Sequence, residues 1–362
     1  MDRRTLLALL ATVSATKLLP ATAAHAQEGS PPPSGAIAPP VAAPSAAEAS
    51  PSHRARVESL LERLRDLETL ETVIVSRNGV LVAERTYGGH SLTGSTNIKS
   101  ASKTIVSALV GIAIDKGLLE GVDQPIETVL RSEFPANPDP RLSRITIGHL
   151  LTMQAGLDRM SGANYGRWVS SRNWARFALA ADFVDEPGGG MLYSTASTHL
   201  LSVILTKVGG KSTLALARDW LGPLEGFRIG AWERDPQGFY LGGNQMAMTP
   251  RSLHAFGELY RRGGVTEEGT RLISADWIRE SWTPRTNSVF NGDGYGYGWF
   301  LKQMAGELVS YAWGYGGQML YIAPRQGLTV TMTSNDSAPS ARTGYREELH
   351  GAMTQVIEIV TT

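Results

Sequence analysis

Two pairs of short apolar runs, one pair near each end of the chain, constrain most strongly what this sequence can fold into. The runs are rich in β-branched residues and cover 72–76, 80–83, 319–322 and 328–332. Asn78-Gly79 separates the first pair, and a tight hairpin turn prefers these residues because both tolerate a positive φ. The turn 324–327 separates the second pair. Strands from both chain ends can share one antiparallel sheet, so we expect the two ends to meet.

Helical patterns occupy the remaining chain. Apolar residues recur at helical spacing over 54–68, and 343–360 is also helical in pattern. Between the two hairpins, 125–245 carries helical patterns at 145–153 and 196–208. The sequence therefore predicts an α+β domain, an antiparallel sheet flanked by helices with an inserted helical subdomain. Clefts commonly form where two such parts adjoin, so we expect the functional site there.

Composition excludes several function classes. Lys plus Arg is 34 and Asp plus Glu is 34, so the formal charge is zero and offers no basic excess for binding nucleic acid. The chain has no cysteine, which excludes disulfides, thiolate metal sites and cysteine nucleophiles. Its seven histidines show no metal-binding spacing. We expect neither a metal nor an organic cofactor, and no nucleic-acid partner.

The first residues read as a targeting segment rather than part of the fold. A basic head with Arg3-Arg4, a short apolar run and the small residues Ala24 and Ala26 predict an export signal over 1–26, which also resembles a twin-arginine signal. Residues 27–52, rich in Pro, Ala and Ser, predict a disordered linker. The domain itself is predicted over 53–362. We expect an exported protein, periplasmic or secreted, without stable membrane insertion after signal cleavage.

Candidate chemistry begins at Ser100 and Lys103. The segment 104–116 is apolar almost all round and predicts a buried helix, so these two residues sit one turn apart on one face at its start. Burial and the positive helix end both disfavour an ammonium, which makes Lys103 a candidate base for the serine proton. The same Ser-x-x-Lys spacing at Ser14 and Lys17, in the predicted export signal, shows how weak the motif is alone. The alternative is an N-capping serine followed by a surface lysine.

Three further segments carry a resemblance to a known family. Residues 145–157, 186–189 (Glu-Pro-Gly-Gly) and 294–299 (Gly-Tyr-Gly-Tyr-Gly-Trp) resemble segments of the serine β-lactamase-related family, in the expected order. That family includes class C β-lactamases, D-Ala-D-Ala carboxypeptidases, β-lactamase-fold esterases and 6-aminohexanoate-dimer hydrolases. The resemblance implies a β-lactamase-like fold with Ser100 as nucleophile and Lys103 as its base. Met153, where many members carry histidine, places the chain nearest the 6-aminohexanoate-dimer hydrolase-like branch.

Two of the boxes that such proteins carry are altered in this chain. Tyr193-Ser194-Thr195 stands where the family has Tyr-x-Asn, so the resemblance implies that Tyr193 relays a proton to the leaving group. It also implies that Thr195 replaces an amide that hydrogen-bonds the acyl side chain. Tyr193 could instead be a half-buried cleft tyrosine.

The third box, Lys-Thr-Gly or His-Thr-Gly, begins a strand in the family. Gly314-Tyr315-Gly316-Gly317 precedes the apolar run that starts after Gln318, so Tyr315 takes the place of the cation and Gly316 that of threonine. By this correspondence the N–H groups of Gln318 and Ser100 form the oxyanion hole, beside Gly317. The alternative is a Gly-rich turn beside an aromatic cluster. Thr343-Gly344, after Arg342, opens the last helical pattern and is therefore rejected as the third box.

The resulting functional prediction is a serine hydrolase that forms an acyl-enzyme on Ser100. In the family, the cation and threonine of the third box bind a substrate carboxylate, so Tyr315 and Gly316 favour ester or amide cleavage over efficient β-lactam hydrolysis. The expected partner is a small ester, amide or short peptide. The alternatives are a penicillin-recognising D-Ala-D-Ala peptidase or β-lactamase, and a non-catalytic binding protein of the same fold.

Two groups of bulky residues have a structural interpretation beside a functional one. His149 and His199 lie in apolar helical patterns and are expected to be hydrogen-bonded core residues rather than metal ligands. Trp168, Trp174 and Trp282 either line an apolar acyl pocket or belong to the core.

Overall fold

The computed structural model describes residues 49–341 and 343–362 of the chain. The predicted export signal and nearly all of the predicted linker lie outside these residues. The first helix, α1 (Pro51–Arg63), begins two residues inside the predicted linker, so the predicted boundary at 53 is slightly late. Ser50 is the reason, because its hydroxyl accepts a hydrogen bond from the His53 N–H at 3.1 Å and Pro51 opens the helix with a preset φ.

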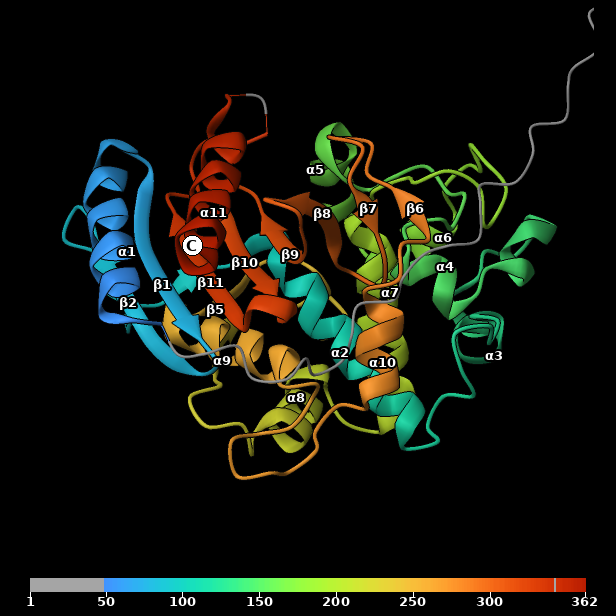
Figure 1. Ribbon diagram of the computed structural model, residues 1–362. Helices are drawn as coiled ribbons and strands as arrows, with labels where there is room; N and C mark the ends of the chain where they lie inside the picture. Colours follow the sequence, from blue (N-terminus) through green and yellow to red (C-terminus); the bar gives the residue numbers. More distant parts are fainter. Residues whose placement is uncertain (1–48, 342) are drawn as a thin grey trace, which may run out of the picture. The chain divides into compact units, whose positions relative to one another are not determined.

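One large antiparallel sheet of eight strands forms the centre of the fold (Figure 1). In order across the sheet the strands are β2 (Val80–Thr86), β1 (Leu70–Arg77), β11 (Leu328–Ser334), β10 (Gln318–Ala323), β9 (Glu307–Gly314), β8 (Phe300–Met304), β7 (Gly294–Tyr295) and β6 (Thr286–Asn287). The pairing of β1 with β11 confirms that the two ends of the domain share one sheet. Asn78 and Gly79 both have positive φ in the first hairpin turn, and the Asn78 N–H donates to the Gly327 carbonyl of the other hairpin at 2.8 Å.

Helices cover both faces of the sheet and build the inserted subdomain. The α-helices after α1 are α2 (Ser102–Asp115), α3 (Glu127–Leu130), α4 (Ile147–Leu151), α5 (Tyr165–Val169), α6 (Trp174–Leu179), α7 (Thr195–Gly209), α8 (Thr213–Leu221), α9 (Pro250–Arg261), α10 (Ala275–Ser281) and α11 (Tyr345–Thr361). Among the described residues no single helix has the length and apolar character to cross a membrane. The helices α7 and α8 meet both criteria only when they are counted together, and the pair is bent by 74°.

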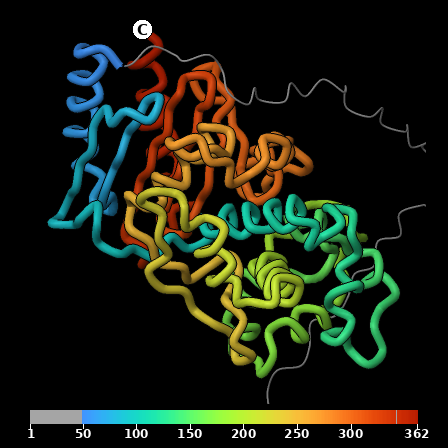
Figure 2. The backbone as a smooth tube through the Cα atoms, turned by 90° about the horizontal axis from the view of Figure 1, so that it is seen from below, coloured from blue at the N-terminus to red at the C-terminus, as the bar shows by residue number. Residues whose placement is uncertain are grey.

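The two faces of the sheet pack against different helices. Side chains from α1 and α11 join one face of the sheet in a single apolar cluster, and Figure 2 shows these two helices side by side at the blue and red ends of the chain. The Arg56 guanidinium donates to the Thr362 hydroxyl at 2.8 Å across this pair. Side chains from α2, α7 and α9 join the opposite face in the largest cluster. The sheet is therefore buried on both sides, which fixes its register.

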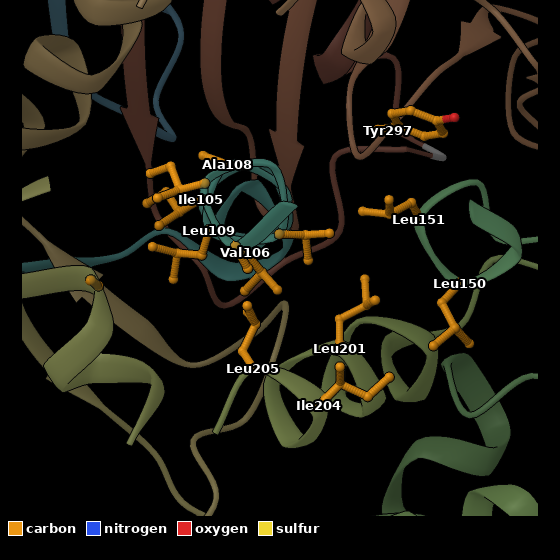
Figure 3. Close-up of a cluster of buried hydrophobic side chains, with 14 of the residues drawn as sticks. Ile105, Val106, Ala108, Leu109, Leu150, Leu151, Leu201, Ile204, Leu205 and Tyr297 are labelled. Atoms are coloured by element: carbon orange, nitrogen blue, oxygen red, sulfur yellow. The ribbon is translucent and has the colours of Figure 1, made fainter. Parts of the chain in front are cut away.

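The helix α2 is buried all round, as its apolar sequence predicts. Val106 of α2 faces Leu205 of α7 in the close-up, where Leu201 and Ile204 of α7 lie below the same helix (Figure 3). Each buried aliphatic side chain of this size contributes roughly 1.5–3 kcal/mol. A helix packed in this way is rigid, and it carries the candidate nucleophile segment at its N-terminal end.

A second, small sheet departs from the predicted helical middle. It consists of β3 (Thr96–Asn97), β5 (Met246–Met248) and β4 (Ile229–Trp232) in that order. The helical part of the insertion therefore ends with α8, and the segment after it returns to pair with the residues just before Ser100. Strands of two to four residues have too little periodicity to be predicted, and only the pairing of distant segments defines them.

Candidate active site

Ser100 lies in a tight turn that joins the small sheet to α2. The turn is the 3₁₀ segment η2 (Lys99–Ala101), and α2 follows at once. Lys99 has a φ of 49°, a left-handed conformation that costs a non-glycine residue roughly 1–2 kcal/mol. Two contacts hold it there, because its N–H donates to Asn97 Oδ1 at 3.0 Å and its ammonium pairs with Asp336 at 2.8 Å. The residue before the candidate nucleophile is thus strained and pinned.

Lys103 points back from the first turn of α2 and touches Ser100. Its Nζ lies 3.0 Å from Ser100 Oγ, 2.6 Å from the Gly243 carbonyl oxygen and 3.5 Å from Thr195 Oγ1. The side chain is only 2% exposed and no carboxylate is among these partners. Burial therefore lowers the pKa of Lys103 from 10.5 to about 7. An amine with this pKa beside a serine hydroxyl can take the serine proton near neutral pH.

Gly243 completes this arrangement and was not predicted from the sequence. Its φ is +80°, and a Cβ atom there would lie 2.7 Å from Lys103 Cγ. Only glycine lets the backbone come close enough for its carbonyl to accept from Lys103. The preceding Gly242 N–H donates to His199 Nδ1 at 3.4 Å, and His199 Nε2 lies 3.1 Å from Asp235 Oδ2. The Gly-Gly pair was the one available signal, and nothing local connects it to Lys103.

Tyr193 lies beside both Ser100 and Lys103. Its side chain is 8% exposed, and Lys103 Nζ lies 5.1 Å from the centre of its ring. Burial raises the pKa of Tyr193 to about 12, and the nearby Ser100 side chain lowers it by less. The phenol is therefore protonated at neutral pH and can donate a proton. Met153 anchors this segment, because its Sδ accepts from the Ser194 N–H at 3.5 Å.

Thr195 faces the lysine rather than open solvent. It is 4% exposed, and its hydroxyl lies 3.1 Å from Ser161 Oγ. Ser161 Oγ also accepts from the Thr195 N–H at 2.9 Å. Ser161, which was not predicted from the sequence, therefore fixes the position of Thr195 beside Lys103.

The turn between β9 and β10 adjoins the nucleophile turn directly. A Cβ atom on Gly314 would lie 2.3 Å from the Ile98 carbonyl oxygen and 3.1 Å from Lys99 Cβ. Gln318, at the start of β10, directs its side chain away into the sheet, where it exchanges hydrogen bonds with the Ser334 backbone. The side chain of Gln318 is therefore engaged within the sheet and not available to a substrate.

The remaining residues of this turn have different exposures. Tyr315 is 48% exposed at the tip. Gly316 has a φ of +86°, and a Cβ atom there would lie 2.5 Å from the Asn335 carbonyl oxygen. Gly317 has a φ of +107° and packs against the Tyr345 ring. Position 316 cannot hold a threonine in this conformation, because both the φ and the contact exclude a β-branched side chain.

The other candidates belong to the body of the fold. Trp168, Trp174 and Trp282 are at most 3% exposed, and the first two flank the His199 ring. His149 closes a capping box with Thr146 at the start of α4. Gly344 is the N-cap of α11, whereas Arg342 lies outside the described residues. Over the described part of the chain, no three His, Asp or Glu side chains are arranged to hold a metal ion.

Comparison with known proteins identifies the family. The family model described as Beta-lactamase matches residues 71–352, which cover the sheet, the helical insertion and about the first half of α11. The chain therefore belongs to the β-lactamase family, as the resemblance of its segments predicts.

Individual relatives lie at low identity. The 6-aminohexanoate-dimer hydrolase of Paenarthrobacter ureafaciens is 24% identical over 319 residues, covering 79% of each chain. The D-amino acid amidase of Ochrobactrum anthropi SV3 superposes with a TM-score of 0.66 at 14% identity, covering 85% of this chain and 98% of that one. EstCE1, a hydrolase with promiscuous acyltransferase activity, superposes with a TM-score of 0.68 at 18% identity, covering 86% and 99%. The solved structures share the fold.

Proposed function

We propose that this protein is a serine hydrolase that cleaves an ester or amide through an acyl-enzyme on Ser100. The observation that carries the proposal is the 3.0 Å contact between Ser100 Oγ and Lys103 Nζ, with the pKa of that buried amine lowered to about 7. A serine followed by a surface lysine would have a solvated ammonium instead. The family match and the hydrolases among the relatives support the same reaction class.

The first half of the reaction uses all three side chains. Lys103, as the neutral amine, takes the hydroxyl proton of Ser100 while Ser100 Oγ bonds to the substrate carbonyl carbon. The carbonyl π electrons move to oxygen, and the backbone N–H groups of Ser100 and Gln318 receive that oxyanion. When the oxyanion collapses, the bond to the leaving group breaks. Tyr193 protonates the departing oxygen or nitrogen and regains its proton from the Lys103 ammonium.

Hydrolysis of the acyl-enzyme reverses these roles. Tyr193 and Lys103 together accept a proton from water as its oxygen attacks the acyl carbon, and Ser100 leaves with a proton restored from Lys103. Gly243 and Thr195 stabilise Lys103 in either charge state, because the carbonyl and the hydroxyl both accept hydrogen bonds from it. Water supplies the only atoms added, so the cycle balances without a cofactor.

The third-box turn favours simple esters and amides over substrates that are held by a carboxylate. Tyr315 brings no charge, and Gly316 has no hydroxyl and no room for one. The name of one structural relative, D-amino acid amidase, denotes cleavage of an amide and so supports this reaction class.

The test is the intact mass of the protein after exposure to a fluorophosphonate. We expect one adduct on the wild type and none on Ser100→Ala, with hydrolysis of simple esters lost in parallel. The control is Ser95→Ala, which removes an exposed serine from the loop before the nucleophile and should label like the wild type.

Two results would contradict the proposal in different ways. An unlabelled wild type, under conditions that label a control serine hydrolase, would favour a non-catalytic binding protein of the same fold. A long-lived penicillin adduct on Ser100, together with slow ester cleavage, would favour a penicillin-recognising enzyme.

A further inference from the structure

An exposed apolar loop tip lies directly beside the candidate proton donor. The loop 288–293 connects β6 and β7, and Phe290 at its tip is 40% exposed while Val289 is 58% exposed. The Phe290 ring meets the Tyr193 ring edge to face with centres 5.2 Å apart, and it meets the Trp313 ring in the same way at 5.5 Å. The loop tip therefore exposes two adjacent apolar side chains, and one of them, Phe290, contacts the candidate proton donor.

The loop is built to hold this tip in place. The Ser288 N–H donates to the Asp293 carbonyl at 2.7 Å, and the Gly292 N–H donates to the Ser288 carbonyl at 2.9 Å. The Asp293 carboxylate accepts from the Tyr311 hydroxyl at 2.7 Å and pairs with Lys302 at 2.8 Å. A buried acid with these partners anchors the base of the loop, so the position of Phe290 at the tip is fixed.

The charges around this tip disfavour an ionic ligand. Lys103 Nζ lies 5.1 Å from the centre of the Tyr193 ring, and the Arg346 guanidinium lies 4.9 Å from that of Trp313. The Trp313 ring already faces the Arg346 guanidinium, so a second cation on that ring would be repelled. Arg346 is 4% exposed and paired with Glu347, and Lys103 is uncharged when it acts as base, so neither is free to bind a substrate carboxylate.

We propose that Phe290 and Val289, with Trp313 behind them, form the subsite for the leaving group, and that this group is uncharged and apolar. The inference rests on the proposed function, in which Tyr193 protonates the leaving group, so the group that departs must lie on the Tyr193 side of Ser100. The substrate class is thereby narrowed to esters or amides of an aryl or alkyl alcohol or amine. Phe290 determines specificity and takes no part in proton transfer.

The experiment compares two isomeric esters in the wild type and in Phe290→Ala. Benzyl acetate carries its phenyl ring on the leaving alcohol, whereas methyl phenylacetate carries it on the acyl group. We expect Phe290→Ala to lower kcat/KM for benzyl acetate about tenfold, mainly through KM, because apolar contact area is lost. The value for methyl phenylacetate should change less than about twofold, and Phe290→Leu should restore most of the loss.

A control variant and a charge comparison complete the design. Val184→Ala removes a valine that is as exposed as Val289, at 58%, from another loop, and it should leave both esters unaffected. Acetylcholine and its neutral carbon isostere 3,3-dimethylbutyl acetate differ only in the charge of the leaving group. We expect the wild type to prefer the neutral ester.

The outcomes separate the subsite from the proposed function. Suppose that the wild type cleaves both aromatic esters while Phe290→Ala lowers kcat/KM equally for the two, or lowers it only for methyl phenylacetate. In either case the assignment of the leaving-group subsite is wrong. A preference for acetylcholine would overturn its uncharged character. If the wild type cleaves no ester and takes no fluorophosphonate, the proposed function fails and this inference fails with it.

Discussion

The two sides of the candidate site differ in how completely the fold encloses them. On one side Lys103 is 2% exposed, and Ser100, Thr195 and Gly243 all lie within hydrogen-bonding reach of its amine. On the other side, across the nucleophile turn, Tyr315 is 48% exposed at the tip of a glycine turn. The first side buries the Lys103 amine among hydrogen-bond partners, whereas the second side is an exposed glycine-rich turn.

This difference separates reaction from recognition. Acyl transfer through a lysine base requires that base to be desolvated, because only burial brings its pKa near neutral. Binding a carboxylate requires a cation within reach, and the sequence correspondence predicts that the uncharged ring of Tyr315 takes the place of the family's cation. We therefore expect the enclosed half of the site to carry the chemistry and the open half to set which substrate is accepted.

The largest expected effect comes from Gly243→Ala, which attacks the enclosed side. The added Cβ would lie 2.7 Å from Lys103 Cγ and 3.1 Å from Nζ, so the amine must move away from Ser100. We expect kcat/KM for a simple ester to fall by roughly 10²-fold or more, the usual contribution of a positioned base.

Gly238→Ala is the matched control for this variant. Gly238 has a φ of +89°, so an alanine there has the same backbone strain, but a Cβ atom would meet nothing within 4 Å. Thermal unfolding of both variants measures that shared strain. If Gly243→Ala remained as active as Gly238→Ala, the close approach of the backbone to Lys103 would have no catalytic role.

The next effect is the dependence of rate on pH. Because the pKa of Lys103 is lowered to about 7, its neutral form is lost as the pH falls below that value. We expect kcat/KM for a neutral ester to drop about tenfold per pH unit below pH 7 and to level off above it. The pKa of Tyr193, raised to about 12, keeps the phenol protonated throughout, so no second inflection is expected below pH 10.

The ionisation of Lys103 should also make the stability of the folded protein depend on pH, in a direction that its lowered pKa determines. Between pH 7 and 10.5 the unfolded chain protonates this lysine and the folded one does not, so the penalty for burying it shrinks as the pH rises. The melting temperature of Lys103→Met relative to the wild type should therefore be higher at pH 7 than at pH 10. A difference that does not change with pH would mean that Lys103 is not buried as a neutral amine.

The smallest effect is expected on the open side, from Tyr315→Lys. The new ammonium would be exposed, so it should raise kcat/KM for an ester with a carboxylate no more than about fivefold, and added salt should reduce the gain. Tyr315→Met, which removes the ring without adding charge, is the comparison. An equal gain for a neutral ester would show that the ring obstructs substrates rather than standing in for a cation.

Local pattern alone anticipated much of the fold. The hairpin at Asn78-Gly79 and the buried helix after Ser100 follow from turn chemistry and from apolar periodicity, both of which are properties of neighbouring residues. The resemblance of 145–157 and 294–299 to the family pointed to the same fold, which the family match confirms. The linker boundary was two residues late because Ser50 and Pro51, which cap and open a helix, also suit a Pro- and Ser-rich linker.

What the sequence determined is the contact between Ser100 and Lys103, since three residues along a helix is one turn and no distant segment is needed to bring them together. Only the tertiary structure decided what that contact can do. Gly243 lies 140 residues from Lys103 and Tyr193 comes from the helical insertion, so the burial that lowers the pKa of the lysine depends on distant segments folding against it. Desolvation depends on everything that surrounds a group, and a linear pattern records only its neighbours along the chain.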